Sequence, residues 1–185
     1  MPDPIEMLTQ DHREVEQLFE QYRQSKDPAV VEQICTELTV HAAAEEQVIY
    51  PALGAEVEGG QGMRQHAEQE HQEVKDAIFE IERIGYSDPG VDQFMQTIIQ
   101  GVTEHVEEEE NEVFPKMRQD MDGDRIATLG DELDATKQQL MAEAETGGPL
   151  IDLTKEKLLE LAADREIEGR TNMSKDQLLT ALRRS

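Results

Sequence analysis

The sequence His41-Ala-Ala-Ala-Glu45-Glu46-Gln-Val-Ile-Tyr50-Pro51 recurs 64 residues later as His105-Val-Glu-Glu-Glu109-Glu110-Asn-Glu-Val-Phe114-Pro115. A second pair of stretches is nearly as close, because Gln10-Asp11-His12-Arg13-Glu14-Val15 matches Gln69-Glu70-His71-Gln72-Glu73-Val74. The chain up to about residue 120 therefore reads as one two-helix unit written twice. Each copy carries one histidine on its first helix and a His/Glu pair on its second. These residue types are metal ligands, which a repeat that serves packing alone has no need to keep.

The spacing within the repeat predicts which side chains share a site. Positions i and i+4 lie about 40° apart around a helix, one turn above the other. His41 with Glu45, and His105 with Glu109, can therefore present an imidazole and a carboxylate to one point.

His66 is the one histidine outside the repeat. It lies five residues before His71, which is roughly 140° around a helix, so the two cannot easily serve one site. We therefore expect His71, and not His66, to be a ligand.

Helical signals dominate the rest of the sequence and predict an all-α protein. Asp-Pro pairs open the first two helices, and Gly/Pro-rich turns separate the others. The expected helices cover residues 4–25, 28 onward, 63–85, 91–120 and 125–144. Four long helices with short joints favour an up-down-up-down four-helix bundle, here with a fifth helix, and bundle interiors commonly hold metal sites. Pro51 and Pro115 should kink or end their helices, with the ligand pairs on regular helix before them.

The composition changes at Gly147-Gly148-Pro149, which reads as a flexible linker. We therefore divide the chain into residues 1–146, the bundle with its extra helix, and residues 150–185, a small helical motif. Two short helices are expected there, at 154–164 and 174–184, the second opened by a capping box of Ser174 and Gln177. Eight apolar side chains could form a miniature core: Leu153, Leu158, Leu161, Ile167, Met173, Leu178, Leu179 and Leu182.

The formal net charge of −25 is concentrated in the first part of the chain. Residues 1–149 hold 35 acidic and 10 basic side chains, whereas residues 150–185 hold seven of each. An acidic surface repels nucleic acid and anionic membranes, so nucleic-acid binding should be weak or absent. The sequence shows no run long enough to cross a membrane and no secretory signal. Cys35 is the only cysteine and is expected in the core, so we expect a cytoplasmic protein.

Four of the five histidines occupy duplicated positions, and imidazole with carboxylate suits iron, zinc or manganese. The candidate ligands are His12, His41, Glu45, His71, His105 and Glu109. One tetrahedral zinc takes four ligands, so this set favours two metal ions. If Glu45 and Glu109 each bridge both ions, each ion also receives two imidazole nitrogens. An oxo or hydroxo bridge then leaves one position open for a small ligand.

The order His12, His41-x-x-x-Glu45, His71, His105-x-x-x-Glu109 resembles the hemerythrin-like, HHE cation-binding family over residues 4–120. The resemblance implies a four-helix bundle with an oxo- or hydroxo-bridged centre of two iron ions, and O2, NO or peroxide as the ligand. Hemerythrins that carry O2 have a His-x-x-x-His pair on the third helix and an Asp ligand on the fourth. Here position 75 is Lys, and Glu109 replaces the Asp. This departure favours redox turnover or sensing over reversible O2 carriage.

Three further residues lie next to these ligands in the sequence. Glu46 and Glu110 are either partners for imidazole N–H groups or solvated carboxylates. Tyr50 could be a ligand or a redox-active neighbour of iron, but we expect it to pack in the core with its hydroxyl at the rim. No catalytic residue is assigned, and whether the protein is an enzyme stays open.

Residues 150–185 are similar to the N-terminal module of Rho transcription termination factors, a SAP-like motif. The resemblance rests on Leu153-Thr-Lys-Glu-Lys-Leu158, Ile167-x-Gly-Arg-Thr171 and Met173-Ser-Lys-Asp176. It implies docking of nucleic acid or protein, but a motif without net charge should bind phosphates weakly.

Two functions follow from the sequence. The first is a non-haem di-iron protein that binds or reacts with O2, peroxide or NO, as a sensor or with peroxide-decomposing activity. The second is an iron- or oxygen-responsive binding module that docks a protein or nucleic-acid partner through its C-terminal motif. A structural bundle with incidental zinc is the plainest alternative.

Overall fold

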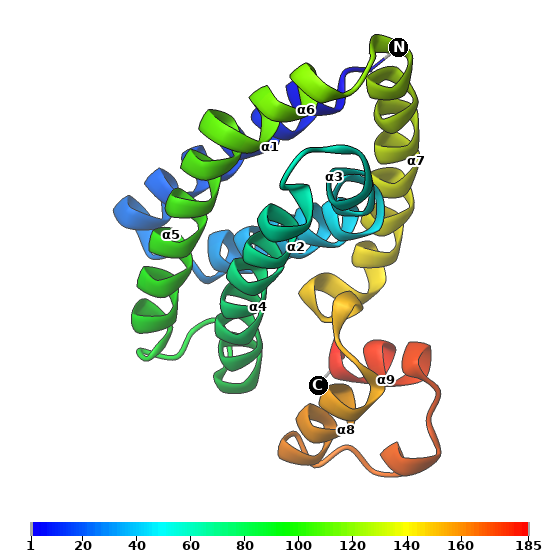
Figure 1. The fold of residues 1–185 in the computed structure, drawn as a ribbon. Coiled ribbons are helices and arrows are strands. Elements are labelled where there is room, and N and C mark those ends of the chain that lie inside the picture. The colour runs from blue at the N-terminus through cyan, green and yellow to red at the C-terminus, as the bar shows by residue number, and fades with distance from the viewer. Residues whose placement is uncertain (1, 185) are drawn as a thin grey trace.

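The computed structural model describes residues 2–184, which are helical without a β-strand (Figure 1). Four long helices form the bundle: α1 (Pro4–Ser25), α2 (Pro28–Ala44), α4 (Gly60–Ile84) and α5 (Val91–Glu108). The predicted all-α four-helix bundle is therefore confirmed. None of the described helices has the length and apolar character needed to cross a membrane.

The first two helices begin where their sequence signals predict. The Asp3 carboxylate accepts hydrogen bonds from the backbone N–H groups of Ile5 and Glu6, and Asp27 accepts one from Ala29. A capping side chain of this kind typically stabilises a helix by about 1 kcal/mol. The proline that follows each aspartate has the φ angle that a helix needs at its first position.

In each copy of the repeat, one short π-helix interrupts the second helix. They are η1 (Glu45–Ile49) and η2 (Glu109–Val113), and they are followed by α3 (Tyr50–Glu56) and α6 (Phe114–Asp120). The prediction that the ligand pairs lie on undisturbed α-helix is therefore wrong. Each proline has no N–H, and its ring would clash with the carbonyl four residues earlier in an α-helix. A single wide turn relieves that clash, so each helix continues instead of ending.

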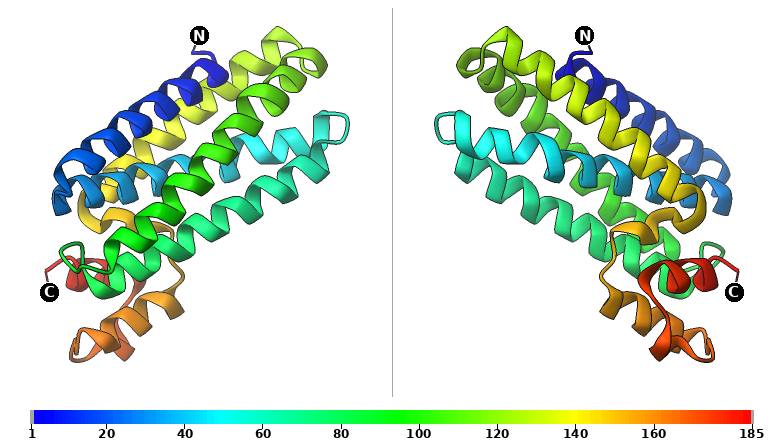
Figure 2. Two further views of the ribbon diagram at one scale, coloured as in Figure 1. Left: turned by 90° about the vertical axis from the view of Figure 1, so that its left-hand side faces the viewer. Right: turned by 90° about the vertical axis from the view of Figure 1, so that its right-hand side faces the viewer.

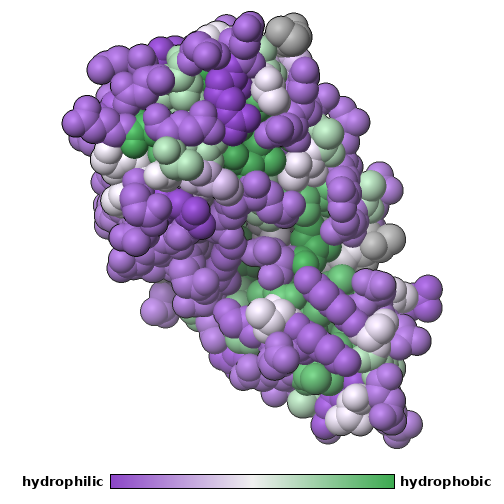
Figure 3. All heavy atoms as spheres, turned by 45° about the vertical axis from the view of Figure 1, so that its right-hand side comes forward, coloured by the Kyte–Doolittle hydropathy of each residue, from purple (hydrophilic) through white to green (hydrophobic). Residues whose placement is uncertain are grey.

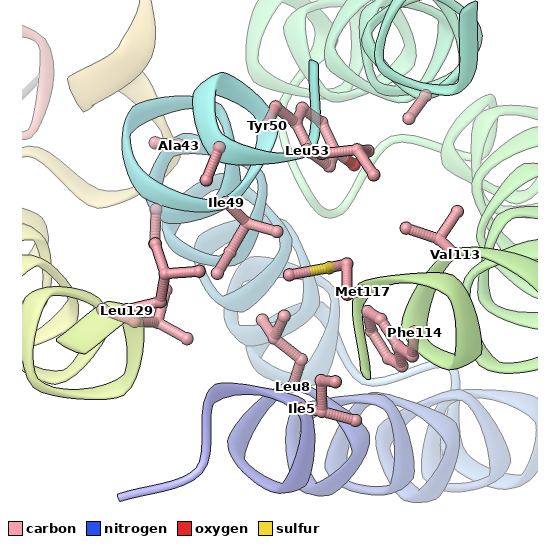
Figure 4. Packing of buried hydrophobic residues seen from close by; sticks show 14 of the residues in the cluster. Ile5, Leu8, Ala43, Ile49, Tyr50, Leu53, Val113, Phe114, Met117 and Leu129 are labelled. Carbon is pink, nitrogen blue, oxygen red and sulfur yellow. The ribbon is translucent and has the colours of Figure 1, made fainter. Parts of the chain in front are cut away.

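The apolar core is divided into two clusters along the bundle. One gathers residues from α1, α2, η1, α3, η2, α6 and the fifth helix, α7 (Gly123–Gly147), and its members Leu8, Ile49 and Met117 point toward one another (Figure 4). The other lies at the opposite end and includes Phe19, Ile34 and the fully buried Cys35. The predicted core position of Cys35 is confirmed. The predicted ligands lie between these clusters along the helices, away from both ends of the bundle.

The fifth helix, α7 (Gly123–Gly147), packs along α1 and α2 (Figure 2). Its buried side chains Leu129, Leu133 and Leu140 join the first core cluster. Gly130 allows a close approach to the N-terminal segment, because a Cβ atom at this position would lie 1.9 Å from the Pro2 carbonyl oxygen. The fifth helix is therefore an integral wall of the bundle.

The C-terminal segment consists of η3 (Gly148–Asp152), α8 (Lys155–Asp164), η4 (Arg170–Asn172) and α9 (Lys175–Leu182). Both predicted helices form, and the capping box of Ser174 and Gln177 is present. The expectation of a flexible linker is wrong, because residues 148–151 are buried in a 3-10 helix against α2.

The miniature core of this segment is completed by the bundle. Phe79 of α4 and Leu150 of η3 belong to the same apolar cluster as Leu158, Leu161 and Leu178. A unit of about 36 residues buries too little apolar surface to be stable alone. This explains why the C-terminal segment packs its apolar side chains against the bundle. Figure 3 shows apolar residues gathered in the seam between the two parts. The division at residues 1–146 and 150–185 stays a prediction.

Candidate metal centre

The structure brings all six predicted ligands together in the bundle interior. His12, His41, His71 and His105 come from α1, α2, α4 and α5, one from each long helix. All four are buried. Glu45 and Glu109 are 0% and 1% exposed and are the first residues of the two π-helical turns.

The ligand atoms form two groups of three. One group is His12, His41 and Glu109, and the other is Glu45, His71 and His105. Each carboxylate also contacts the other group, because Glu45 Oε2 lies 3.2 Å from His41 Nε2 and 3.4 Å from His71 Nε2. Glu109 likewise lies 3.4 Å from His12 Nε2 and 3.6 Å from His105 Nε2. Each carboxylate is therefore within reach of imidazoles of both groups.

Among the residues that the structure describes, three buried atoms at this site have no hydrogen-bond partner: His12 Nε2, Glu45 Oε1 and Glu109 Oε2, the first and last of which lie 3.4 Å apart. A buried polar atom without a partner costs about 1–3 kcal/mol, and three in one place call for a ligand that satisfies them together. Nitrogen and oxygen donors of this kind suit iron, zinc or manganese. The residues present therefore fit a pair of metal ions.

The outer nitrogen of each histidine is held by a carboxylate. The Nδ1 contacts are His12 with Glu110 at 2.9 Å, His41 with Asp11 at 3.2 Å, His71 with Glu46 at 3.1 Å and His105 with Glu70 at 2.8 Å. Such a partner fixes the proton on Nδ1 and leaves Nε2 free to face a metal.

Two of these four carboxylates were missed by the sequence analysis. Glu46 and Glu110 were candidates because they follow the ligands Glu45 and Glu109. Asp11 and Glu70 stand immediately before His12 and His71 in the repeat, and this duplicated acid was the available signal.

Tyr50 lies at the centre of the site, so the expectation that its hydroxyl reaches the rim is wrong. The side chain is fully buried, and its oxygen lies 3.1 Å from His71 Nε2 and 3.3 Å from Glu109 Oε1. Burial raises the pKa of Tyr50 well above its usual value, and the charges of Glu45 and Glu109 add to the effect. Tyr50 therefore stays a neutral phenol that can donate a hydrogen bond.

The second copy has a phenyl ring where the first has this phenol. Phe114 stacks on the His12 ring with 5.9 Å between ring centroids. The Tyr50 hydroxyl therefore contacts ligands of both groups, through His71 and Glu109, whereas the equivalent position of the second copy places only an apolar ring beside His12.

A small cavity is bordered by the four histidines. Its volume is about 30 Å³. Besides the histidines it is lined by Asp11, Glu70 and Lys75 and by seven apolar side chains: Val15, Leu38, Ala42, Val74, Ile78, Val102 and Val106. One water molecule needs about 10–15 Å³ by this measure, so the space accepts a ligand of two or three atoms. An apolar wall of this kind suits a small uncharged molecule.

The metal-free site holds protons on two of its histidines. Burial opposes the charge on His41, but Glu45 and Asp11 outweigh it and raise the pKa to about 10. Burial also opposes the charge on His71, and hydrogen bonds to Glu45 and Glu46 raise the pKa to about 9.

Metal binding should therefore release protons, because a ligating histidine must be neutral. Below pH 9 both groups are protonated in the metal-free form, so affinity should rise with pH, by about tenfold per unit for each proton released. The rise should end above pH 10, where neither histidine retains a proton. Calorimetric titration with metal in buffers of different ionisation enthalpy would count the protons. A count of zero at pH 7.5 would contradict this prediction.

His66 lies outside the buried site. Its side chain is 57% exposed and lies 3.1 Å from Glu108, which agrees with the exclusion of His66 from the predicted ligands.

Three similarities to known proteins accompany this geometry. Residues 3–117 match the family model of the hemerythrin HHE cation binding domain. A DNA nickase from Nostoc sp. strain PCC 7120 is 30% identical over 139 residues, which are 73% of this chain and 39% of the relative. The chain thus spans less than half of that relative. A hemerythrin HHE cation binding domain-containing protein of known structure, from Mycobacterium kansasii, matches with a TM-score of 0.68 and 20% identity over 89% of this chain and 99% of its own. This last similarity concerns the fold alone.

Proposed function

The chain belongs to the hemerythrin HHE cation-binding family, and on this premise we propose that it is a non-haem di-iron protein that binds or reacts with O2, peroxide or NO. The observation that carries the proposal is the pair of buried His/Glu groups, in which each carboxylate faces histidines of both groups. Two iron ions would supply the electrons for binding or reducing such a ligand. His12 and His41 with Glu109 would hold one ion, and His71 and His105 with Glu45 the other.

The residues around the ligands support small-molecule chemistry in this centre. The apolar cavity beside the histidines has room for a diatomic molecule or peroxide. The Tyr50 hydroxyl can donate a hydrogen bond toward Glu109 or toward a small ligand that replaces this contact. Because Phe114 offers no such donor beside His12, the two halves should differ in reactivity.

Aerobically purified protein should contain about two iron ions per chain, because the six candidate ligands exceed the four that one tetrahedral ion takes. It should also show a charge-transfer band in the near ultraviolet. Metal analysis and an absorption spectrum test both points together. A colourless protein with a single zinc ion would contradict the proposal of a di-iron centre.

A peroxide assay then separates an enzyme from a switch. Sustained decomposition over many turnovers would favour an enzyme, whereas oxidation that stops after one equivalent per site would favour a sensor. The measurement should follow oxygen release and the absorption band in the same sample.

The second candidate is a binding module that responds to iron or oxygen and docks a partner through residues 150–185. The similarity to a DNA nickase gives this reading its support. Two observations argue against a nucleic-acid partner. The bundle carries a large negative charge, which repels phosphates. In addition, several basic side chains of residues 150–185 already form ion pairs with carboxylates of the bundle. These pairs are Lys157 with Asp76, Arg165 with Glu82 and Arg183 with Glu32. Nicking of supercoiled plasmid, or tight binding of single strands at physiological salt, would move the function to this class.

A further inference from the structure

Two of the four carboxylates that hold the histidines are themselves held by a lysine. Lys75 Nζ donates to both oxygens of Glu46, at 2.9 and 2.8 Å. Lys137 Nζ donates to both oxygens of Asp11. These lysine side chains are 17% and 22% exposed, so neither ion pair is an ordinary contact in open water. Each lysine restrains a carboxylate that in turn orients an imidazole.

The two lysines are distributed evenly over the centre. Lys137 acts on Asp11 and thus on His41, which belongs to the group with His12 and Glu109. Lys75 acts on Glu46 and thus on His71, which belongs to the other group. Each candidate ion would therefore have one histidine with a lysine behind its carboxylate.

Both lysines also connect the centre to elements other than the helices that carry the histidines. Lys137 is a residue of α7. Lys75 lies 2.7 Å from the Asp152 carboxylate, in the 3-10 helix η3 that packs against α2. A continuous series of contacts thus runs from His71 through Glu46 and Lys75 to Asp152.

We propose that Lys75 and Lys137 are positioning residues of the metal centre, which act through Glu46 and Asp11. The proposal rests on the metal-binding function given above. Glu46 reaches the surface, with a side chain that is 28% exposed, and without Lys75 it would be free to turn toward water. The Nδ1 atom of His71 would then lose the partner that fixes its proton and its ring orientation. Helix α7, through Lys137, and η3, through Asp152 and Lys75, thereby influence how firmly each half of the centre holds its ion.

Two physical effects of removing a lysine oppose each other, and their opposite signs separate them. Loss of a positive charge near the site strengthens the binding of a cation, whereas loss of orientation weakens it. Between physiological salt and 1 M salt the Debye length falls from about 8 Å to about 3 Å, but charges that are partly buried are screened less than exposed ones. Weaker binding by a lysine variant therefore identifies the loss of orientation, and 1 M salt reduces the part of the charge effect that opposes it.

The test uses the full-length protein with Co²⁺ as an oxygen-stable probe, measured by competition with a chelator at 0.15 M and 1 M salt. Lys75→Met and Lys137→Met should each weaken Co²⁺ binding at 1 M salt by about tenfold, the low end of the range seen when outer partners of metal ligands are lost. Lys75→Arg should restore most of the affinity, because it keeps a charged donor. Lys157→Met is the matched control, since its ion pair with Asp76 does not reach a histidine, and it should leave binding unchanged.

A double substitution shows whether Lys75 acts through Glu46. Glu46→Gln should weaken binding by itself, and adding Lys75→Met should then have no further effect. Independent losses that multiply would overturn the proposal. If Lys75→Met fails to fold, as judged by circular dichroism, Asp152→Asn takes its place and should give a smaller loss at 1 M salt.

Failure of this inference can be told from failure of the proposed function. A wild-type protein that binds no Co²⁺ at the buried site contradicts the metal-binding function. A wild-type protein that binds two ions, with lysine variants that bind as tightly as Lys157→Met at 1 M salt, contradicts only the positioning role.

Discussion

Replacing His71 by alanine is expected to empty at least one half of the metal centre, whereas His66→Ala should leave the metal content unchanged. The two histidines lie five residues apart on α4, but only His71 is buried and faces Glu45 at 3.4 Å. Loss of a direct ligand should weaken binding by more than the roughly 10–100-fold that follows loss of an outer partner. Metal content after gel filtration, with the circular dichroism spectrum as a folding check, measures the difference.

His66→Ala serves as the matched control for this experiment, because it removes the same side chain from the same helix. Equal metal loss from both variants would contradict the assignment of His71 and would show that the exposed group of His66, Glu70 and Glu108 contributes to binding.

Leu150→Ala should destabilise the whole protein by about 2–5 kcal/mol, the range for a fully buried leucine. Leu150 is 0% exposed and lies in η3, where the C-terminal segment meets the bundle. Its cluster includes Phe79 of α4, so the cavity would be felt on both sides of the junction. Urea unfolding of the metal-free protein, followed by circular dichroism, gives the free energy of unfolding.

The control for this substitution is Leu159→Ala on α8, where the side chain is only partly buried. It should cost clearly less than Leu150→Ala. If Leu150→Ala instead shifts a minor early transition and leaves the main midpoint in place, residues 150–185 unfold as an independent unit.

The fold and the clustering of the six candidate ligands could be predicted because their signals are local. The i, i+4 spacing of His41 with Glu45 is a property of one helix, and the duplication supplied the second pair at His105 and Glu109. The carboxylates that hold the histidines could also be predicted from local sequence. Glu46 was a candidate because it follows the ligand candidate Glu45. Asp11 was overlooked, although the second copy has an acidic residue, Glu70, at the same position.

The remaining features depend on contacts that one stretch of sequence does not contain. The π-helical turns arise where Pro51 and Pro115 meet helices that tertiary packing keeps continuous. Tyr50 follows directly on the widened turn η1, and its hydroxyl meets His71 of another helix. Lys75 and Lys137 meet their carboxylates across 29 and 126 residues of chain, and no local pattern marks such pairs.

Each group of candidate ligands combines residues from both copies of the repeat, and this has a consequence for folding. His12 and His41 come from the first copy, but the carboxylate grouped with them, Glu109, comes from the second. In the other group, Glu45 comes from the first copy, whereas His71 and His105 come from the second. Neither helical hairpin can complete a coordination set alone, so metal would act as a cross-link between them. Because a ligand that binds only the assembled form stabilises it by mass action, two peptides that each contain one hairpin should associate more tightly when metal is added.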